Sequence, residues 1–313
     1  MATSRARMLL ALAALCVLFS PLVILLGLPV PWALRWAAPP RTAFMIHRER
    51  QARRAGDSLA IVHEWVPLEE LPDHLVRAVL VAEDDRFRAH RGVDWVALGQ
   101  EVRYAGGEAF SWASEEDRRA LRAAIRYGVQ HRSELKGRST LTQQLAKNLY
   151  FTPGRSLARK VAELVVALRL ERMLGKDRIL ELYLNTAELG HGIFGVGAAA
   201  RAYFGVPASR LTQFQSASLA ATLPHPLTSN PGYRPGRMAW RRDLILARLA
   251  GRDVTIPDEP PPIELPDLAP IELPPGIVIP PDTTLPDTTL PDTASPDTVR
   301  TDTVRPDTVR PRP

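Results

Sequence analysis

Apolar residues recur at helical spacing through most of the middle of the chain. From Asp73 to Phe87, apolar side chains return every three or four residues, which is the period of one helix face. The same period runs from Leu157 to Met173, from Ile179 to Leu184, from Leu211 to Leu223 and from Met238 to Leu249. No convincing alternation of apolar and polar residues indicates a strand. The pattern predicts a mainly α-helical domain.

A longer apolar stretch lies near the N-terminus. No charged side chain occurs from Met8 to Leu34, and this exceeds the ~20 residues that a helix needs to cross a bilayer. The alternative is a cleaved signal peptide, whose apolar region is usually only about 7–15 residues long. Arg5 and Arg7 precede the stretch, and basic residues favour the cytoplasmic side. We therefore expect residues 1–35 to form a cytoplasmic N-terminus and one transmembrane anchor.

Composition divides the rest of the chain into three zones. Residues 36–65 form a polar, Arg-rich connector, residues 66–251 a folded domain large enough for one core, and residues 252–313 a Pro-rich tail. In the tail, Asp-Thr recurs every five residues from Asp282 to Asp307. Such a segment buries too little apolar surface to offset the entropy lost on ordering. We expect the tail to be disordered and extended, and inert rather than a spacer or docking arm.

Charge and cysteine content narrow the chemistry. The formal net charge is +6. A basic chain can bind nucleic acid, but a domain outside the membrane rarely meets any, so anionic lipid head groups or a pyrophosphate are the expected partners. The sequence contains a single cysteine, Cys16, which excludes a disulfide within the chain and a cysteine metal cluster.

One carboxylate at the end of an apolar helical stripe is a candidate general base. Glu83 ends the stripe and is followed by Asp84 and Asp85. Desolvation by an apolar wall raises the proton affinity of a carboxylate, which suits proton abstraction near neutral pH. Arg88 and His90 could then orient a sugar or hold phosphate oxygens. A solvated helix end is the alternative interpretation of an isolated glutamate.

The stretch from Gly137 to Asn148 is dense in hydrogen-bonding side chains and contains no acidic residue. Thr140 and Gln143 match a capping box that opens a helix. Gln143 and Lys147 share one face of that helix, where amides suit sugar hydroxyls and an ammonium suits a phosphate. A solvated amphipathic face is the alternative, but such a face usually alternates acids and bases.

More cations follow this stretch. Arg155, Arg159 and Lys160 come shortly before Glu163. Together with Lys147 they predict a compact positive site of the kind that grips a diphosphate leaving group. Attraction of a basic helix to a lipid surface is the alternative that composition leaves open.

Five motifs occur in one order along the chain. They are Glu83-Asp84-x-x-Phe87-x-x-His90-x-Gly92-x-Asp94, Ser139-Thr140-x-Thr142-Gln143-Gln144-x-x-Lys147-Asn148, Arg159-Lys160-x-x-Glu163, Ile179-Leu180-Glu181-x-Tyr183-Leu184-Asn185 and Gly195-Val196-x-Ala198-Ala199-Ala200-x-x-Tyr203-Phe204. This set resembles the motifs of the peptidoglycan glycosyltransferases, glycosyltransferase family 51, over about residues 66–250. With one anchor and no penicillin-binding domain, the chain is similar to the monofunctional biosynthetic transglycosylase branch.

The resemblance implies a lysozyme-like, mainly helical fold and polymerisation of lipid II, a disaccharide-peptide on undecaprenyl diphosphate, into β-1,4-linked strands. It implies that Glu83 takes the proton from the acceptor 4-hydroxyl, and that Glu163 assists at the donor diphosphate, directly or through an optional Mg²⁺ or Mn²⁺. A single in-line displacement inverts the anomeric carbon. The substrate-binding residues that the resemblance implies are Asp84, Phe87, His90, Ser139, Thr140, Gln143, Gln144, Lys147, Asn148, Arg155, Arg159 and Lys160.

The resemblance also sets the expected location and partners. It implies an inner-membrane protein with a periplasmic catalytic domain that binds lipid II, the growing glycan chain and the membrane. Cell-wall synthesis or division proteins are candidate partners, and nucleic acid is not expected. The stretch from Glu101 to Lys136 is longer than the family's usual membrane-facing jaw, so acceptor entry is expected to differ. The alternatives are an inactive lipid II-binding scaffold, against which Glu83, Glu163 and Lys147 argue together, and a lytic enzyme.

Overall fold

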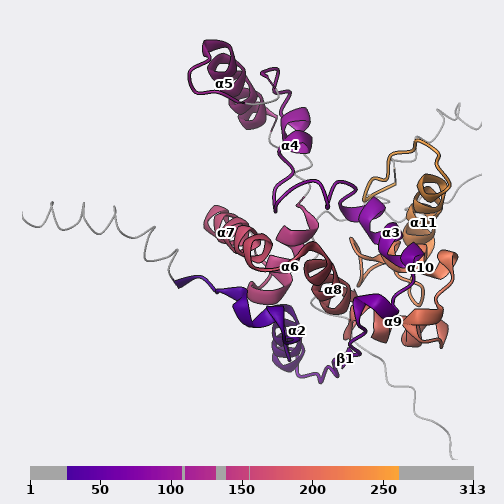
Figure 1. The fold of residues 1–313 in the computed structure, drawn as a ribbon. Coiled ribbons are helices and arrows are strands. Elements are labelled where there is room, and N and C mark those ends of the chain that lie inside the picture. The colour runs from indigo at the N-terminus through magenta and orange to yellow at the C-terminus, as the bar shows by residue number, and fades with distance from the viewer. Residues whose placement is uncertain (1–26, 108–109, 132–138, 155, 261–313) are drawn as a thin grey trace, which may run out of the picture. The chain divides into compact units, whose positions relative to one another are not determined.

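Helices account for most of the chain that the structure describes, as the apolar periodicity predicts (Figure 1). The structure is a computed structural model, and it describes residues 27–107, 110–131, 139–154 and 156–260. The α-helices are α2 (Ala43–Arg54), α3 (Asp73–Glu83), α4 (Trp95–Glu101), α5 (Glu115–Gln130), α6 (Leu141–Tyr150), α7 (Leu157–Met173), α8 (Lys176–Thr186), α9 (Gly195–Phe204), α10 (Gln213–Thr222) and α11 (Gly236–Leu249). Short 3₁₀ helices are η1 (Pro31–Arg35), η2 (Leu68–Glu70) and η3 (Ala208–Arg210).

Two groups of helices build the core around the site. Helix α3 packs against α10 and α11, and α6 packs against α7 and α8 (Figure 1). The buried residues of α3 are Leu75, Ala78, Val79 and Ala82, whose spacing of three or four puts them on one face. Buried apolar side chains of both groups belong to a single continuous cluster. The site residues at the ends of α3 and α6 are therefore held by rigid elements.

Polar side chains fix where several helices begin. Ser156 accepts a hydrogen bond from the backbone N–H of Arg159 at the start of α7, whose ends match the expected Leu157 to Met173. Thr140 accepts from the backbone N–H of Gln143, which is one half of the expected capping box. The reciprocal box forms instead at the start of α10, between Thr212 and Gln215.

Helix α3 ends earlier than the apolar pattern predicts. The expected helix continued to Phe87, but the last helical residue is Glu83. Asp84 leaves the helical conformation, with φ −161° and ψ 75°, and its side chain turns toward the start of α6. The apolar period could not show this end, because the cause is a hydrogen bond to a distant part of the chain. Glu83 thus becomes a terminal residue of the helix.

A small sheet is present where the sequence predicts no strand. Strands β1 (Val62–His63), β2 (Glu188–Gly190) and β3 (Ile193–Phe194) are arranged in the order β1-β3-β2. Strand β3 pairs parallel with β1 and antiparallel with β2. Each strand is too short to display an alternating pattern, which needs at least about four residues.

The glycine-rich stretch beside the sheet lies against other backbone segments. A Cβ on Gly195 would lie 2.6 Å from the carbonyl oxygen of Asn185, and one on Gly197 would lie 2.4 Å from that of Glu64. Gly195 also has φ +82°, which disfavours other residues. Asn185 then links this region to the chain before α3, because its side chain bonds both the N–H and the carbonyl of Val66, each at 2.8 Å.

The chain before residue 66 packs onto the helices. Helix α2 lies in the expected connector and contacts α6. Arg48 on α2 makes a bidentate pair with the buried Glu188, at 2.7 and 2.8 Å. Arg178 on α8 donates to the carbonyls of Leu34 and Ala37.

Among the described residues, none of the helices combines the length and the apolar character that a bilayer crossing requires. Most of the expected anchor, residues 1–26, lies outside the described residues, and η1 occupies its end. The anchor and the start of the catalytic domain remain predictions.

The folded chain continues past residue 251, where the sequence analysis placed the end of the domain. Ile256 is only 5% exposed and belongs to the core cluster. Asp258 pairs with Arg241 at 3.3 Å, and its carbonyl oxygen lies 3.2 Å from Nε2 of His225. The remainder of the expected tail, residues 261–313, lies outside the described residues.

Two truncations test this assignment. We expect a chain ending at residue 251 to have a melting temperature lower by about 5 °C or more than a chain ending at residue 260. Loss of the buried Ile256 alone costs about 2 kcal/mol, and each kcal/mol shifts the melting temperature by about 2–4 °C in a domain of this size. Thermal unfolding followed by circular dichroism measures the difference. Equal melting temperatures would remove residues 252–260 from the folded domain.

Candidate active site

Glu83 is largely buried at the C-terminal end of α3 and is held from two sides. Its side chain is 9% exposed. Oε2 accepts a hydrogen bond of 2.9 Å from Nε2 of Gln144, on α6. Oε1 lies 3.3 Å from Nη2 of Arg241, on α11. A solvated helix end is therefore wrong for this residue, and the carboxylate occupies a desolvated position with charged and neutral donors around it.

Tyr183 fixes the orientation of the Gln144 amide. Its hydroxyl donates to Oε1 of Gln144 at 3.0 Å, which leaves the amide N–H groups to face Glu83. Burial raises the pKa of Tyr183 well above its ordinary value, and the charge of Glu83 acts in the same direction. The hydroxyl thus stays a donor over the physiological pH range.

A surface hollow opens beside Glu83. Its lining is formed by Val81, Glu83, Asp84, Asp85, Arg86, Asp94, Ala97, Ser139 and Thr140. The motif that contains Glu83 and the motif that contains Ser139 thus meet at one cavity, although they are far apart in sequence. The hollow brings the candidate base together with the first polar residues of the second motif.

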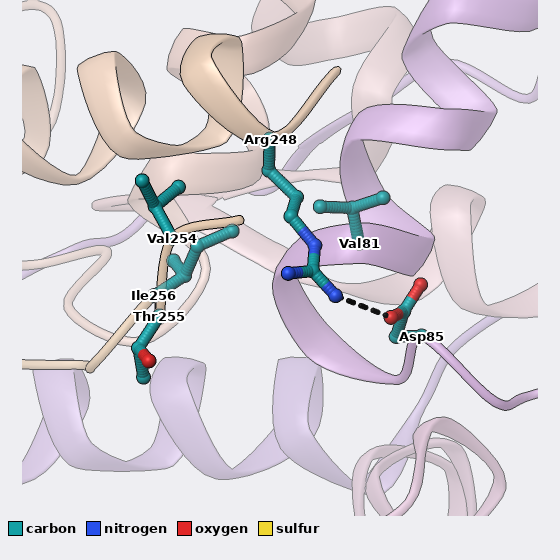
Figure 2. Close-up of a pocket in the computed structure, with 6 residues that line it drawn as sticks. All are labelled: Val81, Asp85, Arg248, Val254, Thr255 and Ile256. Atoms are coloured by element: carbon teal, nitrogen blue, oxygen red, sulfur yellow. Dashed lines mark hydrogen bonds and ion pairs between the residues drawn. The ribbon is translucent and has the colours of Figure 1, made fainter. Parts of the chain in front are cut away.

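A second hollow lies between α3, α11 and the segment that follows α11. Figure 2 shows Arg248 reaching across it from α11 toward Asp85, with the two charged groups 3.3 Å apart. Val254, Thr255 and Ile256 form its other wall. Val81 and Asp85 line both hollows, so this second one lies next to the Glu83 hollow.

The expected cations gather around Glu163 on α7. Its side chain is 4% exposed; Arg159 donates to Oε1, and Nζ of Lys160 lies 3.8 Å from Oε2. Lys160 also donates to Oγ of Ser139 at 2.6 Å, which ties this cluster to the lining of the Glu83 hollow. Arg155 lies outside the described residues.

Lys147 on α6 lies within the fields of both candidate catalytic carboxylates. Burial lowers the pKa of Lys147, and the positive charges of Lys160 and Arg159 lower it further. Glu163 and Glu83 act in the opposite direction. The charges of Glu83, Glu163, Arg159 and Lys160 thus all influence Lys147.

Several residues expected to contact substrate also make contacts that support the site, and two of them, Asp84 and Thr140, line the hollow as well. Phe87 is fully buried in the core. Nε2 of His90 bonds the Asp84 carboxylate at 2.9 Å, and the same carboxylate accepts from the backbone N–H of Leu141 at 2.9 Å. The buried Thr140 donates to the carbonyl of Gly92 at 2.7 Å. These contacts join the first motif to the start of α6.

The remaining predicted residues lie at the surface of this assembly. Gln143 and Asn148 are partly exposed on α6. Arg88 forms an exposed ion pair with Asp177, at 2.8 Å, and is not among the residues around Glu83. The expectation that Arg88 and His90 orient a sugar or a phosphate is therefore not supported by their positions.

Arg241 and Tyr183 contribute to the site but were not predicted as site residues. Tyr183 lay within the fourth motif without a role, and Arg241 lay in a plain helical stretch. Arg241 is 1% exposed, although arginine is rarely fully buried unless it is paired. The spacing of residues in a sequence motif could not identify Arg241, because its contact is with Glu83, 158 positions away.

The side chains around Glu163 do not suit the binding of a divalent cation. Both of its oxygens already face positive groups, which would repel the ion. Within the described ranges, no group of three or more His, Cys, Asp or Glu side chains could hold a metal. We therefore derive no step through a metal.

The fold and the site are those of an enzyme that transfers glycosyl groups. The transglycosylase family model matches residues 53–109 and 108–250. A biosynthetic peptidoglycan transglycosylase of Azoarcus sp. (strain BH72) is 40% identical over 216 residues, which cover 69% of this chain and 83% of the relative. A protein with the same description from Pseudomonas entomophila (strain L48) is 38% identical over 220 residues, which cover 69% of this chain and 83% of the relative. Another from Nitrosomonas eutropha (strain DSM 101675 / C91 / Nm57) is 37% identical over 241 residues, which cover 74% of this chain and 89% of the relative.

The chain therefore belongs to the transglycosylase family. This confirms the resemblance of its motifs to the monofunctional peptidoglycan glycosyltransferases of glycosyltransferase family 51.

Two neighbouring substitutions test the supporting role of Asp84. We expect Asp84→Ala to destabilise the domain by about 2–3 kcal/mol, because it leaves the buried His90 and the first N–H of α6 without their acceptor. The matched control is Asp85→Ala, whose side chain is 57% exposed and whose ion pair is expected to contribute less than about 1 kcal/mol. Chemical denaturation of both variants measures the difference. Equal losses would contradict the supporting role.

Proposed function

We propose that this transglycosylase polymerises lipid II into β-1,4-linked glycan strands and releases undecaprenyl diphosphate, with inversion at the anomeric carbon. The observation that carries the proposal is the arrangement of Glu83, Lys147 and Glu163. The largely buried carboxylate of Glu83 lines the same hollow as Ser139, and Ser139 accepts a hydrogen bond from Lys160 of the basic cluster. A sugar hydroxyl is a weak nucleophile that needs a base, whereas a diphosphate leaving group needs positive charge.

In the proposed reaction, Glu83 removes the proton from the 4-hydroxyl of the acceptor sugar. That oxygen forms the new bond to the donor's anomeric carbon while the bond from this carbon to the diphosphate breaks. The electron pair of the broken bond leaves on the diphosphate. A single displacement of this kind converts an α-linked donor into a β-linked product.

The basic cluster is the proposed binding site for the donor diphosphate. Within the described part of the chain, Nε of Arg159 is a buried donor that no protein atom satisfies. A buried unpaired donor is costly, and a ligand oxygen would satisfy it. Ser139, Gln143, Gln144 and Asn148 belong to the same proposed site, together with Arg155.

We also propose that the protein is anchored in the inner membrane by residues 1–35, with the catalytic domain on the periplasmic side. Trp32 lies near the end of the uncharged stretch and Trp36 just after it, and they are 60% and 72% exposed. Tryptophan is enriched at membrane interfaces, where its ring bridges apolar and polar surroundings. Exposed Trp95 and Trp112 lie near and within the long segment between the first two motifs and support a second membrane contact there.

Replacement of Glu83 tests the proposed base. We expect purified full-length protein to form glycan strands from labelled lipid II, and Glu83→Gln to reduce the rate by about 10²–10⁴-fold, since an amide cannot accept the proton. Gel analysis of the glycan products measures both rates. Glu70→Gln, at an exposed position, is the control and should retain the parental rate.

The same assay separates the alternatives. A lipid II-binding scaffold would bind the substrate without releasing undecaprenyl diphosphate. A lytic enzyme would shorten finished strands rather than build them. An equal rate for the parent and Glu83→Gln would reject Glu83 as the base.

The pH dependence of the rate tests the role of Lys147. Burial lowers the pKa of this lysine, so its ammonium loses its proton at a lower pH than an ordinary lysine, and donor binding should weaken on the alkaline side. As the pH is raised, we expect the polymerisation rate of the parent to begin falling before pH 10.5, the ordinary pKa of lysine. Lys147→Arg stays charged, so its rate should not show this fall, whatever its value at neutral pH. An identical alkaline limb in both proteins would remove Lys147 from the diphosphate site.

A further inference from the structure

Arg241 is the largest fully buried side chain of the described residues, and its burial needs an explanation. It lies on α11, in a stretch whose other features are those of an ordinary amphipathic helix. Removing a guanidinium from water costs several kcal/mol unless acceptors surround it. Its neighbour Arg242 shows the ordinary alternative, because it pairs with Asp243 and lies over the ring of Phe214.

The acceptors of Arg241 cluster at the end of α3. Nη2 donates to the carbonyl of Ala82 at 2.9 Å, and Nη1 and Nη2 lie 3.4 and 3.3 Å from Oε1 of Glu83. Carbonyls at the C-terminus of a helix carry partial negative charge, so the guanidinium binds both the end of the helix and its last side chain. Asp258 contacts the same Nη2 at 3.3 Å but is 66% exposed, which makes Glu83 the more desolvated partner.

The other carboxylate oxygen has a neutral partner. Oε2 of Glu83 accepts from Gln144, whose amide is oriented by Tyr183. Arg241 therefore acts on Oε1, while the amide of Gln144 binds Oε2. Two contacts from different helices determine both the position and the rotation of the carboxylate.

We propose that Arg241 is a positioning residue that holds Glu83 in its reactive orientation and stabilises its charged form. This inference rests on the proposed role of Glu83 as the base. Arg241 donates no proton to the substrate and accepts none. The proton of the acceptor hydroxyl passes to Glu83, and Arg241 ensures that the carboxylate is ionised and correctly turned when the acceptor arrives.

Other charged groups also act on Glu83 and must be considered in any pH experiment. Asp84 follows it at the end of α3, Tyr183 faces it from α8, and Lys147 on α6 and Asp258 after α11 lie in the same electrostatic neighbourhood. None of these groups is replaced when Arg241 alone is changed, although Asp258 then loses one of its partners. A shift of the acid limb in an Arg241 variant therefore reports the loss of this one guanidinium.

The test compares pH–rate profiles for lipid II polymerisation by the full-length parent, Arg241→Gln, Arg241→Lys and the control Arg242→Gln. We expect Arg241→Gln to lower kcat by at least about tenfold with little change in KM, because substrate contacts are intact. We also expect the acid limb of the Arg241→Gln pH–rate profile to lie about one pH unit higher than that of the parent. An adjacent cation favours the ionised carboxylate, and this variant has lost that cation. Arg241→Lys should restore the limb in part, and Arg242→Gln should match the parent.

A purely structural role for Arg241 gives a different result. It would lower the amount of folded enzyme, as measured by circular dichroism at the assay temperature, without moving the acid limb, and that outcome would overturn the proposal. A thermal-stability cycle with Glu83→Gln supplies a readout that needs no activity. We expect the double variant Glu83→Gln with Arg241→Gln to lose less stability than the sum of the single losses, because each single change leaves a buried group unpaired. Additive losses would contradict the pairing.

The outcomes for the two proposals are distinct. Full activity of Glu83→Gln would reject the proposed base whatever the Arg241 variants do. An inactive Glu83→Gln together with a parental acid limb in Arg241→Gln would reject only the positioning role.

Discussion

The site depends on holding the largely buried carboxylate of Glu83 between donors from two other helices. An isolated buried carboxylate would take up a proton or destabilise the fold, so its surroundings must supply compensating groups. For Glu83 these are a guanidinium from α11 and an amide from α6. Each partner is itself fixed, the amide by Tyr183 and the guanidinium by backbone carbonyls. Packing among α3, α6, α8 and α11 is thus a requirement of the chemistry as well as of the core.

Residues of the first motif hold the site together as well as take part in its chemistry. Glu83 and Asp84 both line the hollow, Asp84 also joins His90 to the start of α6, and Phe87 fills the core. The ammonium of Lys176 lies 4.2 Å from the centre of the Phe87 ring, which adds a contact with α8. A motif therefore marks residues that are needed together, and it does not say which of them touch the substrate. Burial and hydrogen bonds make that distinction here.

Sequence patterns predicted the parts of the fold that depend on local periodicity. The apolar period of α7 gave its ends correctly, and Ser156 caps its start. Its buried apolar residues include Val166, Ala167 and Leu170, whereas Val161 and Leu168 are 53% and 45% exposed. The sheet was missed, since its strands are too short to alternate. Arg241 was missed for another reason: an arginine in an amphipathic helix usually faces solvent, and only the tertiary contact with Glu83 reveals its burial.

The basic cluster shows why a second carboxylate is useful near a site for a negatively charged donor. Lys147, Arg159 and Lys160 would repel one another strongly if they were packed without an anion. Glu163 compensates them in the free protein, and its own burial makes this interaction stronger than at the surface. A diphosphate entering the cluster would take over part of this compensation. The cations can then stay close together in both states, so their arrangement needs little reorganisation when negative charge develops on the leaving group.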